Sequence, residues 1–292
     1  MSRIYLFLIA VLMGINSFAQ DSNAPAKSSW GGVNDRKGQW YAYWGYNRDY
    51  YGKSDIHYTG PGYDFKLLGA RADDMTAPWD PKVYLNWKQM SVPQFNARIG
   101  YFVTDRFILS AGWDHMKYRL TPVQSLVIDG YIDPTKYDPT VLNNPTGVFN
   151  NQTITYTTKF MDFHHSNGFN FVRASAEYRS PIWINKSGKA GLYQYSAVSA
   201  GIILPWTDFT FYGQRWLNWL HVAGAGVSVS TGFRAEVGKH FFAQAGLQYG
   251  FAFMPNIILQ DGGKPRAKQT IEFFERSWAI GTYIGPIKKK KK

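Results

Sequence analysis

The chain has 292 residues, a formal net charge of +12 and no cysteine, which excludes disulfides and a lipid-modified cysteine. Its mean hydropathy is −0.31. After the N-terminal segment, no apolar stretch approaches the roughly 18 residues that a membrane-spanning helix needs. Aromatic residues nevertheless make up 17% of the chain. Low mean hydropathy combined with many aromatic side chains is typical of a transmembrane β-barrel with aromatic girdles, and it argues against a soluble enzyme.

The N-terminus has the pattern of a secretory signal peptide. Arg3 precedes an apolar run at 4–13 that is too short to span a bilayer, and 17–19 (Ser-Phe-Ala) is the small-x-small pattern of a cleavage site. The polar, turn-rich segment that follows predicts a flexible periplasmic lead-in. The sequence thus divides into a signal peptide at 1–20, the lead-in at 21–37, a barrel domain at 38–287 and a poly-lysine tail at 288–292.

Long period-2 alternation is the main structural signal. It is clearest at 222–254, where a turn at 238–240 joins two strands of roughly fifteen residues with one apolar face and one small or polar face. Strands of soluble proteins average about 5–6 residues, whereas strands of an outer-membrane barrel cross the hydrocarbon at a tilt, with apolar side chains toward lipid. Eight such strands are predicted, at 39–47, 92–103, 107–118, 168–179, 192–204, 222–237, 241–254 and 271–284.

The connections between these strands alternate in length. Those after the first, third, fifth and seventh strands are long, and the other three are short, which is the asymmetry of an outer-membrane barrel with periplasmic turns and surface loops. The segments 55–58 and 63–68 predict a hairpin beyond the membrane, and 125–132 and 153–160 predict short β pieces within a long loop. We therefore expect an all-β, antiparallel barrel of eight strands; counting the hairpin as part of the wall gives the alternative of ten.

Charged residues fall on the inward parity of these strands. An eight-stranded barrel leaves an interior that side chains just fill, and charges of both signs in so narrow a space must be paired and hydrogen-bonded. We expect these pairs to plug the barrel, and a gated or proton-linked pore is the alternative. The same alternation predicts that the opposite face contacts lipid, for example at Phe95, Ala97, Ile99 and Tyr101. Arg276 also falls on the lipid-facing side, and its long side chain should snorkel to the outer interface. The predicted inward charges are Arg98, Asp114, Arg173, Glu177, Arg179, Arg234, Glu236 and Glu275.

Four segments of the chain resemble recurrent segments of small outer-membrane β-barrel proteins of Bacteroidetes-type bacteria. They are Tyr41–Arg48 (YAYWGYNR), Ser54–His57 (SDIH), Gly112–Tyr118 (GWDHMKY) and His165–Asn170 (HSNGFN). The resemblance implies an eight-stranded barrel of the OmpA, OmpX or OmpW kind in the outer membrane of a Gram-negative cell. Such barrels usually end on an aromatic residue, whereas here further residues and the poly-lysine run follow Tyr283.

The segment His164-His165-Ser166-Asn167 resembles the H-x-S-N signature of the outer-membrane lipid A 3-O-deacylases, which are also eight-stranded barrels. The resemblance implies that His164 is a base, Ser166 a nucleophile and Asn167 an oxyanion donor. Two residues apart on a strand, His164 and Ser166 share one outward face. An acid that orients the histidine is missing nearby, because Glu177 lies about 36 Å away along an extended strand at ~3.3 Å per residue.

A competing interpretation pairs His165 with Asp114 by a hydrogen bond near the outer rim. The simplest interpretation is that all these residues only form a polar rim that closes the barrel top and catalyse no reaction. Asp55, His57 and His115, together with the paired histidines, show no metal-ligand spacing, since adjacent residues on a strand point to opposite faces. We expect neither a metal nor a cofactor. The glycines at 224 and 226 lie inside a strand and do not form a phosphate loop.

The positive charge behind a signal peptide predicts lipid partners. Outer-membrane lipid and the phosphates of lipopolysaccharide are the expected acidic partners, with an envelope protein as a further partner and no nucleic acid. The five terminal lysines are expected to be a solvated tail.

We expect a non-enzymatic barrel that works through its surface loops as a structural, adhesive or envelope-assembly component. The alternatives are a hydrolase of lipid A or another lipid ester that uses His164 and Ser166, and a narrow channel for small or hydrophobic solutes.

Overall fold

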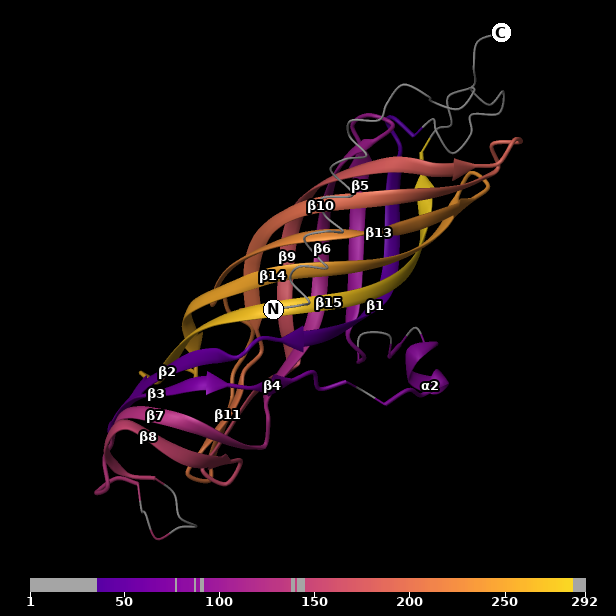
Figure 1. Ribbon diagram of the computed structural model, residues 1–292. Coiled ribbons are helices and arrows are strands. Elements are labelled where there is room, and N and C mark those ends of the chain that lie inside the picture. The colour runs from indigo at the N-terminus through magenta and orange to yellow at the C-terminus, as the bar shows by residue number, and fades with distance from the viewer. Residues whose placement is uncertain are drawn as a thin grey trace.

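The computed structural model describes residues 36–76, 78–86, 88–89, 92–137, 140 and 145–285. Eight antiparallel strands form a ring that closes where the first of them pairs with the last, from Trp40 opposite Ile284 to Tyr51 opposite Phe273 (Figure 1). The prediction of an eight-stranded antiparallel barrel is confirmed. Around the ring the strands are β1 (Trp40–Tyr51), β5 (Phe95–Phe102), β6 (Phe107–Leu120), β9 (Met161–Ile184), β10 (Ala190–Pro205), β13 (Gly224–Val237), β14 (Phe241–Ile258) and β15 (Arg266–Ile284).

A second β unit, which we call the extension, continues the wall at one end of the barrel. After Gly52 and Lys53 the chain continues as strand β2. β2 pairs with the N-terminal part of β15, whereas β1 pairs with the C-terminal part of the same strand. Three more strands and a short hairpin complete the extension at the lower left of Figure 1. Its elements are β2 (Ser54–Gly60), β3 (Tyr63–Ala70), β7 (Val123–Ile132), β8 (Gly147–Thr157) and the hairpin β11 (Asp208–Phe211) with β12 (Gln214–Leu217), which docks on β9.

The other end of the barrel carries the short turns and the two ends of the described chain. Gly38 donates its backbone N–H to the carbonyl of Phe102, and Tyr283 donates to the carbonyl of His240 in the turn between β13 and β14. Short turns and both chain ends at one rim, with the long connections at the other, make this rim the periplasmic side.

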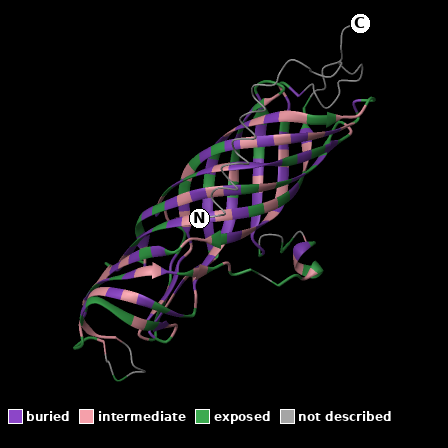
Figure 2. Ribbon diagram, viewed as in Figure 1, coloured by how far each residue is buried: buried purple, intermediate pink, exposed green. Residues whose placement is uncertain are grey.

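Along each strand, apolar side chains on the outer face alternate with polar and charged side chains on the inner face. On β13, Val227, Phe233 and Val237 are exposed while Arg234 and Glu236 are buried, and Figure 2 shows buried and exposed residues alternating along the whole wall. In water this arrangement would be inverted, because exposed apolar side chains and buried charges both cost free energy. The exterior of the ring is therefore a surface for lipid.

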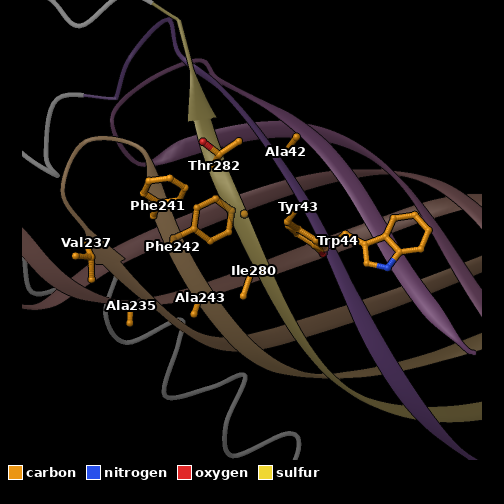
Figure 3. A pocket seen from close by; sticks show the side chains of 11 residues that line it. Ala42, Tyr43, Trp44, Ala235, Val237, Phe241, Phe242, Ala243, Ile280 and Thr282 are labelled. Atoms are coloured by element: carbon orange, nitrogen blue, oxygen red, sulfur yellow. The ribbon is translucent and has the colours of Figure 1, made fainter. Parts of the chain in front are cut away.

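An apolar groove on this exterior lies near the periplasmic rim. Ala42, Ala235 and Ala243 leave a hollow of about 740 Å³ between the larger Trp44 and Phe241 (Figure 3). Its other lining residues are Tyr43, Val237, Phe242, Ile280, Gly281 and Thr282. The groove suits contact with acyl chains.

Several predicted connections are shorter or more ordered in the structure. Residues 181–184 of the connection predicted at 181–189 belong to β9, and 256–258 and 266–269 of the loop predicted at 256–269 belong to β14 and β15. The loop predicted at 205–219 contains the β11–β12 hairpin. Pro181 and Pro255 lie where the register of the strand pair shifts, and a bulge accommodates proline because its missing N–H is not needed there.

Phe95 also differs from the prediction of lipid contact. Its side chain is 2% exposed, because it stacks on Trp44 with ring centroids 4.3 Å apart and lies between Trp113 and His115.

Between β3 and β5 the chain forms the two-residue strand β4 (Ala72–Asp73), which pairs with the end of β6, and the short helix α2 (Pro81–Tyr84), which lies outside the barrel wall. Asp80 caps α2 by accepting from the backbone N–H of Lys82, and a proline opens its first turn. No helix in the described part of the chain is long and apolar enough to cross a membrane.

The predicted signal peptide, all but the last two residues of the predicted lead-in and the poly-lysine tail lie outside the described residues. Arg36 and Lys37, which the lead-in prediction included, pack at the periplasmic rim, where both backbone N–H groups donate to Asp105.

Candidate functional site

The interior of the barrel holds a column of ion pairs in three tiers. In the tier nearest the periplasm, Glu236 accepts from Arg36 at 2.9 Å, from Arg179 and from the hydroxyl of Tyr283 at 2.5 Å. The Arg36 guanidinium lies 3.6 Å from the centre of the Tyr283 ring. Arg36 was not among the predicted lumen residues, because it precedes the first strand and no alternation marks it.

Glu177 forms the middle tier. Its carboxylate accepts from the hydroxyls of Tyr41 at 2.6 Å and Ser110 at 2.5 Å. Guanidinium nitrogens of Arg98 and Arg234 each lie 3.7 Å from it. Four donors or cations from four strands therefore converge on one buried carboxylate.

Asp114 forms the tier nearest the extension. It accepts from Arg173 Nε at 2.6 Å and from Gln248 Nε2 at 3.3 Å, and Arg98 Nη2 lies 3.5 Å from it. Glu275 accepts from Asn47 at 3.0 Å.

All eight predicted inward charges lie in this column, and each is at most 7% exposed. Such pairs are costly to desolvate and stay only where geometry and hydrogen bonds compensate. Side chains therefore fill the cross-section of the barrel at the height of the ion pairs.

Aromatic side chains fill the interior beyond the ion pairs. The centre of this aromatic core is Phe65, Phe163, Phe209 and Phe211, with Phe65 and Phe211 stacked at 5.9 Å and Phe209 and Phe211 at 5.9 Å. The interior thus changes from charged to aromatic along the axis.

A bulge in β9 displays the H-x-S-N segment on the outside. Met116 of β6 pairs with Phe169, and Tyr118 pairs with His165, so that Ser166, Asn167 and Gly168 all face the single residue Lys117. Gly168 has a φ of +149°, a conformation that glycine adopts without strain. Bulges of this kind re-aim side chains and are common beside active sites.

Ser166 and His164 form a hydrogen-bonded pair in this bulge. Ser166 Oγ lies 2.8 Å from His164 Nδ1. The other ring nitrogen, Nε2, lies 3.7 Å from Asp208 and 3.9 Å from Asp162. Asn167 is exposed beside the pair. The predicted outward placement of His164 and Ser166 is what the structure shows, and two carboxylates, absent from the prediction, supply the acidic side of the cluster.

Two arginines hold these carboxylates. Arg119 Nη2 donates to Asp162 at 2.9 Å, and Arg215 donates to Asp208 through two nitrogens. Asp208 lies on β11, directly opposite His164 of β9, and Arg119 lies opposite His164 on β6. Sequence reasoning missed Asp208 because it is distant in the chain and comes from a hairpin that was predicted as loop.

The pair lies above the hydrocarbon. Tyr178 pairs with Phe107 beside the periplasmic turn. From residue 178 to residue 166, a strand rising ~3.3 Å per residue and tilted by about 40° climbs roughly 30 Å. The apolar band of such barrels is about 25 Å tall, so Ser166 and His164 reach the height of lipid headgroups. Burial lowers the pKa of His164, against the opposing effect of Asp162 and Asp208. The lowered pKa favours the neutral imidazole, the form that can accept the serine proton.

The predicted hydrogen bond between His165 and Asp114 is wrong. Asp114 lies opposite Phe171, whereas His165 lies opposite Tyr118. Phe171 lies six residues along β9 from His165, so the two side chains lie at different heights along the axis, and the bulge shortens this offset by two residues without closing it. His165 contacts Thr207 Oγ1 at 3.2 Å and packs among aromatic rings, and Asp114 pairs with arginines instead.

The remaining histidines have local partners. His57 Nε2 lies 2.6 Å from Asp64 Oδ1, and His115 Nδ1 lies 2.8 Å from Asn170 Oδ1. Within the part of the chain that the structure describes, no three His, Cys, Asp or Glu side chains gather as metal ligands would.

The closed ring, its apolar exterior and its filled interior define the class: this is a small eight-stranded antiparallel β-barrel with the architecture of outer-membrane barrels. No family model and no curated protein matches the chain.

Solved structures with a similar fold include outer-membrane proteins. Ail, the attachment invasion locus protein of Yersinia pestis, is 12% identical, with a TM-score of 0.32 over 85% of this chain and 99% of that one. OprG from Pseudomonas aeruginosa is 10% identical, with a TM-score of 0.37 over 89% and 100%. AlkL in DMPC bilayers is 14% identical, with a TM-score of 0.41 over 91% and 98%. At these scores the class rests on the geometry of the ring, and a Bacteroidetes origin stays a prediction.

Proposed function

We propose that this outer-membrane barrel acts at the cell surface as a binding component, in which strand β8 pairs with an extended segment of another envelope protein. The observation that carries the proposal is the edge of the extension. β8 pairs with β7 on one side, and the sheet ends there in the described part of the chain. From Gly147 to Thr157 the strand contains neither a charged residue nor proline.

Natural proteins usually protect such an edge with lysine, proline or a covering loop, because its free N–H and C=O groups accept another strand. A bulge at Asn150 and Asn151 interrupts β8, and Asn151 has a φ of +50°. The uncharged residues 152–157 beyond the bulge are suited to strand addition, in which backbone hydrogen bonds supply the affinity. The filled barrel beneath it supports an anchoring role, since ion pairs occupy the cross-section that a solute would need.

Photocrosslinking in intact cells tests this function. A photoreactive residue at Gln152 should give one adduct of defined mass larger than the barrel. In a cell that also carries Thr155→Lys, the adduct should fall at least about tenfold, because a charge on the edge disfavours pairing. The matched control is Ser125→Lys, which adds the same charge directly opposite Thr155 on the neighbouring strand β7. Absence of an adduct, or equal loss in both variants, would contradict the proposal; an adduct of twice the barrel mass would identify a second copy as partner.

The hydrogen bond between Ser166 and His164 favours a second candidate, a hydrolase of lipid esters. Ser166 Oγ would attack the ester carbonyl while His164 Nδ1 takes its proton and returns it to the departing alcohol. Water would then cleave the acyl-serine and release a fatty acid. Asp208 would orient the imidazole from the Nε2 side.

Mass spectrometry of lipid A incubated with the purified barrel tests the candidate. Loss of one acyl chain should occur with the wild type and should slow by about 10³-fold or more in Ser166→Ala. Ser187→Ala, in an exposed periplasmic turn, is the control and should retain the rate. Unchanged lipid A with the wild-type protein rules the hydrolase out and leaves the β8 proposal standing.

A further inference from the structure

Two arginines face each other on the outside of the barrel. Arg48 of β1 and Arg276 of β15 are directly opposite in the strand register. Arg276 is exposed and Arg48 half-buried. Like charges opposite each other on adjacent strands destabilise a sheet. An anion bound between the two arginines would remove this repulsion.

Among the described residues, no carboxylate lies within ion-pair distance of either arginine; the Asp74 carboxylate interacts with Arg48 only at longer range and accepts a hydrogen bond from Gln94. Arg48 donates to the hydroxyl of Tyr84 at 2.7 Å and to the carbonyl of Asn47 at 2.7 Å. The guanidinium of Arg276 lies 5.5 Å from the ring of Tyr50. The carboxylate of Glu272, on the same face of β15, is bound by the hydroxyl of Tyr249 at 2.5 Å. The lumen arginines, by contrast, lie beside carboxylates.

Aromatic side chains surround the two cations. On β1, the outward neighbours of Arg48 are Tyr46 and Tyr50; on β15, those of Arg276 are Phe274 and Trp278. The Arg48 guanidinium lies 5.9 Å from the Trp278 ring. An aromatic girdle marks a membrane interface.

The height of the pair agrees with the outer interface. Trp40 and Ile284 pair at the periplasmic rim, and each arginine is eight residues away, from 40 to 48 and from 284 to 276. At ~3.3 Å per residue and a tilt of about 40°, this is roughly 20 Å. Long arginine side chains extend about 5 Å further toward the headgroups, which brings the guanidinium groups to the outer edge of a band about 25 Å tall.

The segment around α2 borders the site on its outer side. Tyr46 donates to the carbonyl of Tyr84 at 2.5 Å, which holds the helix against β1. Trp79 and Leu85, on either side of the helix, are 67% and 78% exposed. Exposed tryptophan and leucine at this height suit contact with lipid, so the arginine pair lies between the barrel wall and a segment that rests on the membrane surface.

We propose that Arg48 and Arg276 together bind a phosphate of lipid A, the lipid anchor of lipopolysaccharide, in the outer leaflet. A phosphomonoester carries up to two negative charges and three terminal oxygens, which matches two guanidinium groups, whereas a phospholipid diester carries one charge. This site is independent of the β8 edge and of Ser166.

Native mass spectrometry of the detergent-purified barrel tests the proposal. Bisphosphorylated lipid A should bind, and the double variant Arg48→Gln/Arg276→Gln should weaken its binding by roughly tenfold or more, since charge-assisted hydrogen bonds are lost. Arg48→Lys/Arg276→Lys, which keeps both charges, should retain part of the affinity. The matched control removes two exposed cations at the periplasmic turns, Lys186→Gln/Lys239→Gln, and should leave binding unchanged.

Two further lipids complete the test. Dephosphorylated lipid A should bind the wild type and the double variant equally weakly. Phosphatidylglycerol that binds as tightly as lipid A, and with the same dependence on the arginines, would overturn the assignment to lipid A. Equal loss in the glutamine and control variants would also overturn it. Heat-modifiable migration on gels verifies that each variant is folded.

Discussion

The ion-paired lumen and the aromatic core of the extension are built from the same wall but stabilised differently. In the ring, strands face lipid outward and bury charges such as Glu177 and Arg234 inward; in the extension, the strands bury Phe65, Phe209 and Phe211 instead. The difference follows the surroundings. Where the outside is hydrocarbon, apolar side chains are best placed there and the polar remainder must be paired inside, whereas above the membrane the hydrophobic effect places aromatic side chains inside.

The largest effect is expected from breaking the lumen column. Glu236→Ala leaves the buried guanidinium groups of Arg36 and Arg179 without their shared carboxylate. Removing one partner of a buried ion pair costs about 3–5 kcal/mol. Urea unfolding of the barrel in lipid vesicles, followed by tryptophan fluorescence, should show this loss. Asp261→Asn, in an exposed turn, is the control and should unfold as the wild type does.

Removing an aromatic side chain of the extension should unfold that region alone. Phe211 contacts Tyr63, Phe65 and Phe160, and Phe211→Ala should cost about 3 kcal/mol through lost burial and the cavity left behind. Limited proteolysis should then cut within the extension while the barrel keeps its heat-modifiable migration. If the barrel lost its folded migration at the same temperature as the extension, the two regions would be a single cooperative unit.

A charge on the outer wall tests the lipid-facing half of the comparison. Ile280 is 74% exposed and lies four residues from the periplasmic end of β15 at 284, or roughly 10 Å up, near the middle of the hydrocarbon. Ile280→Arg should cost about 2 kcal/mol or more in vesicles. In a detergent that lets water reach the wall, the loss should shrink, and a loss equal in both media would argue against lipid at this position.

The smallest effect is expected at the outer arginine pair. Arg276→Gln removes a cation that has no carboxylate within ion-pair distance in the described chain, so stability in lipid without lipopolysaccharide should change by no more than about 0.5 kcal/mol. Unfolding by urea should give the same midpoint as the wild type. A loss as large as that of Glu236→Ala would mean that Arg276 is structural.

The wall of the barrel could be predicted from sequence because alternation is local. Val227, Phe233 and Arg234 each reveal their face through their immediate neighbours. Lengths were harder to predict, since Pro181 and Pro255 lie just beyond predicted strand ends at 179 and 254, yet bulges accommodate both prolines within longer strands.

Which residues meet at the candidate site depends on the register between strands, and the alternation of apolar and polar residues does not determine that register. Asp114 pairs with Phe171, six residues along β9 from His165, and nothing in the residue types indicates this register. Asp208 reaches His164 only because a hairpin folds back on β9. Arg36 was missed for a related reason: it enters the lumen from outside the strands.

One strand, β15, is hydrogen-bonded to β1 in the membrane and to β2 above it. A pull on the extension is therefore carried along the length of β15 as shear, against a row of hydrogen bonds that must all break together. Tension applied to the extension therefore reaches the bilayer through the hydrogen-bonded wall itself.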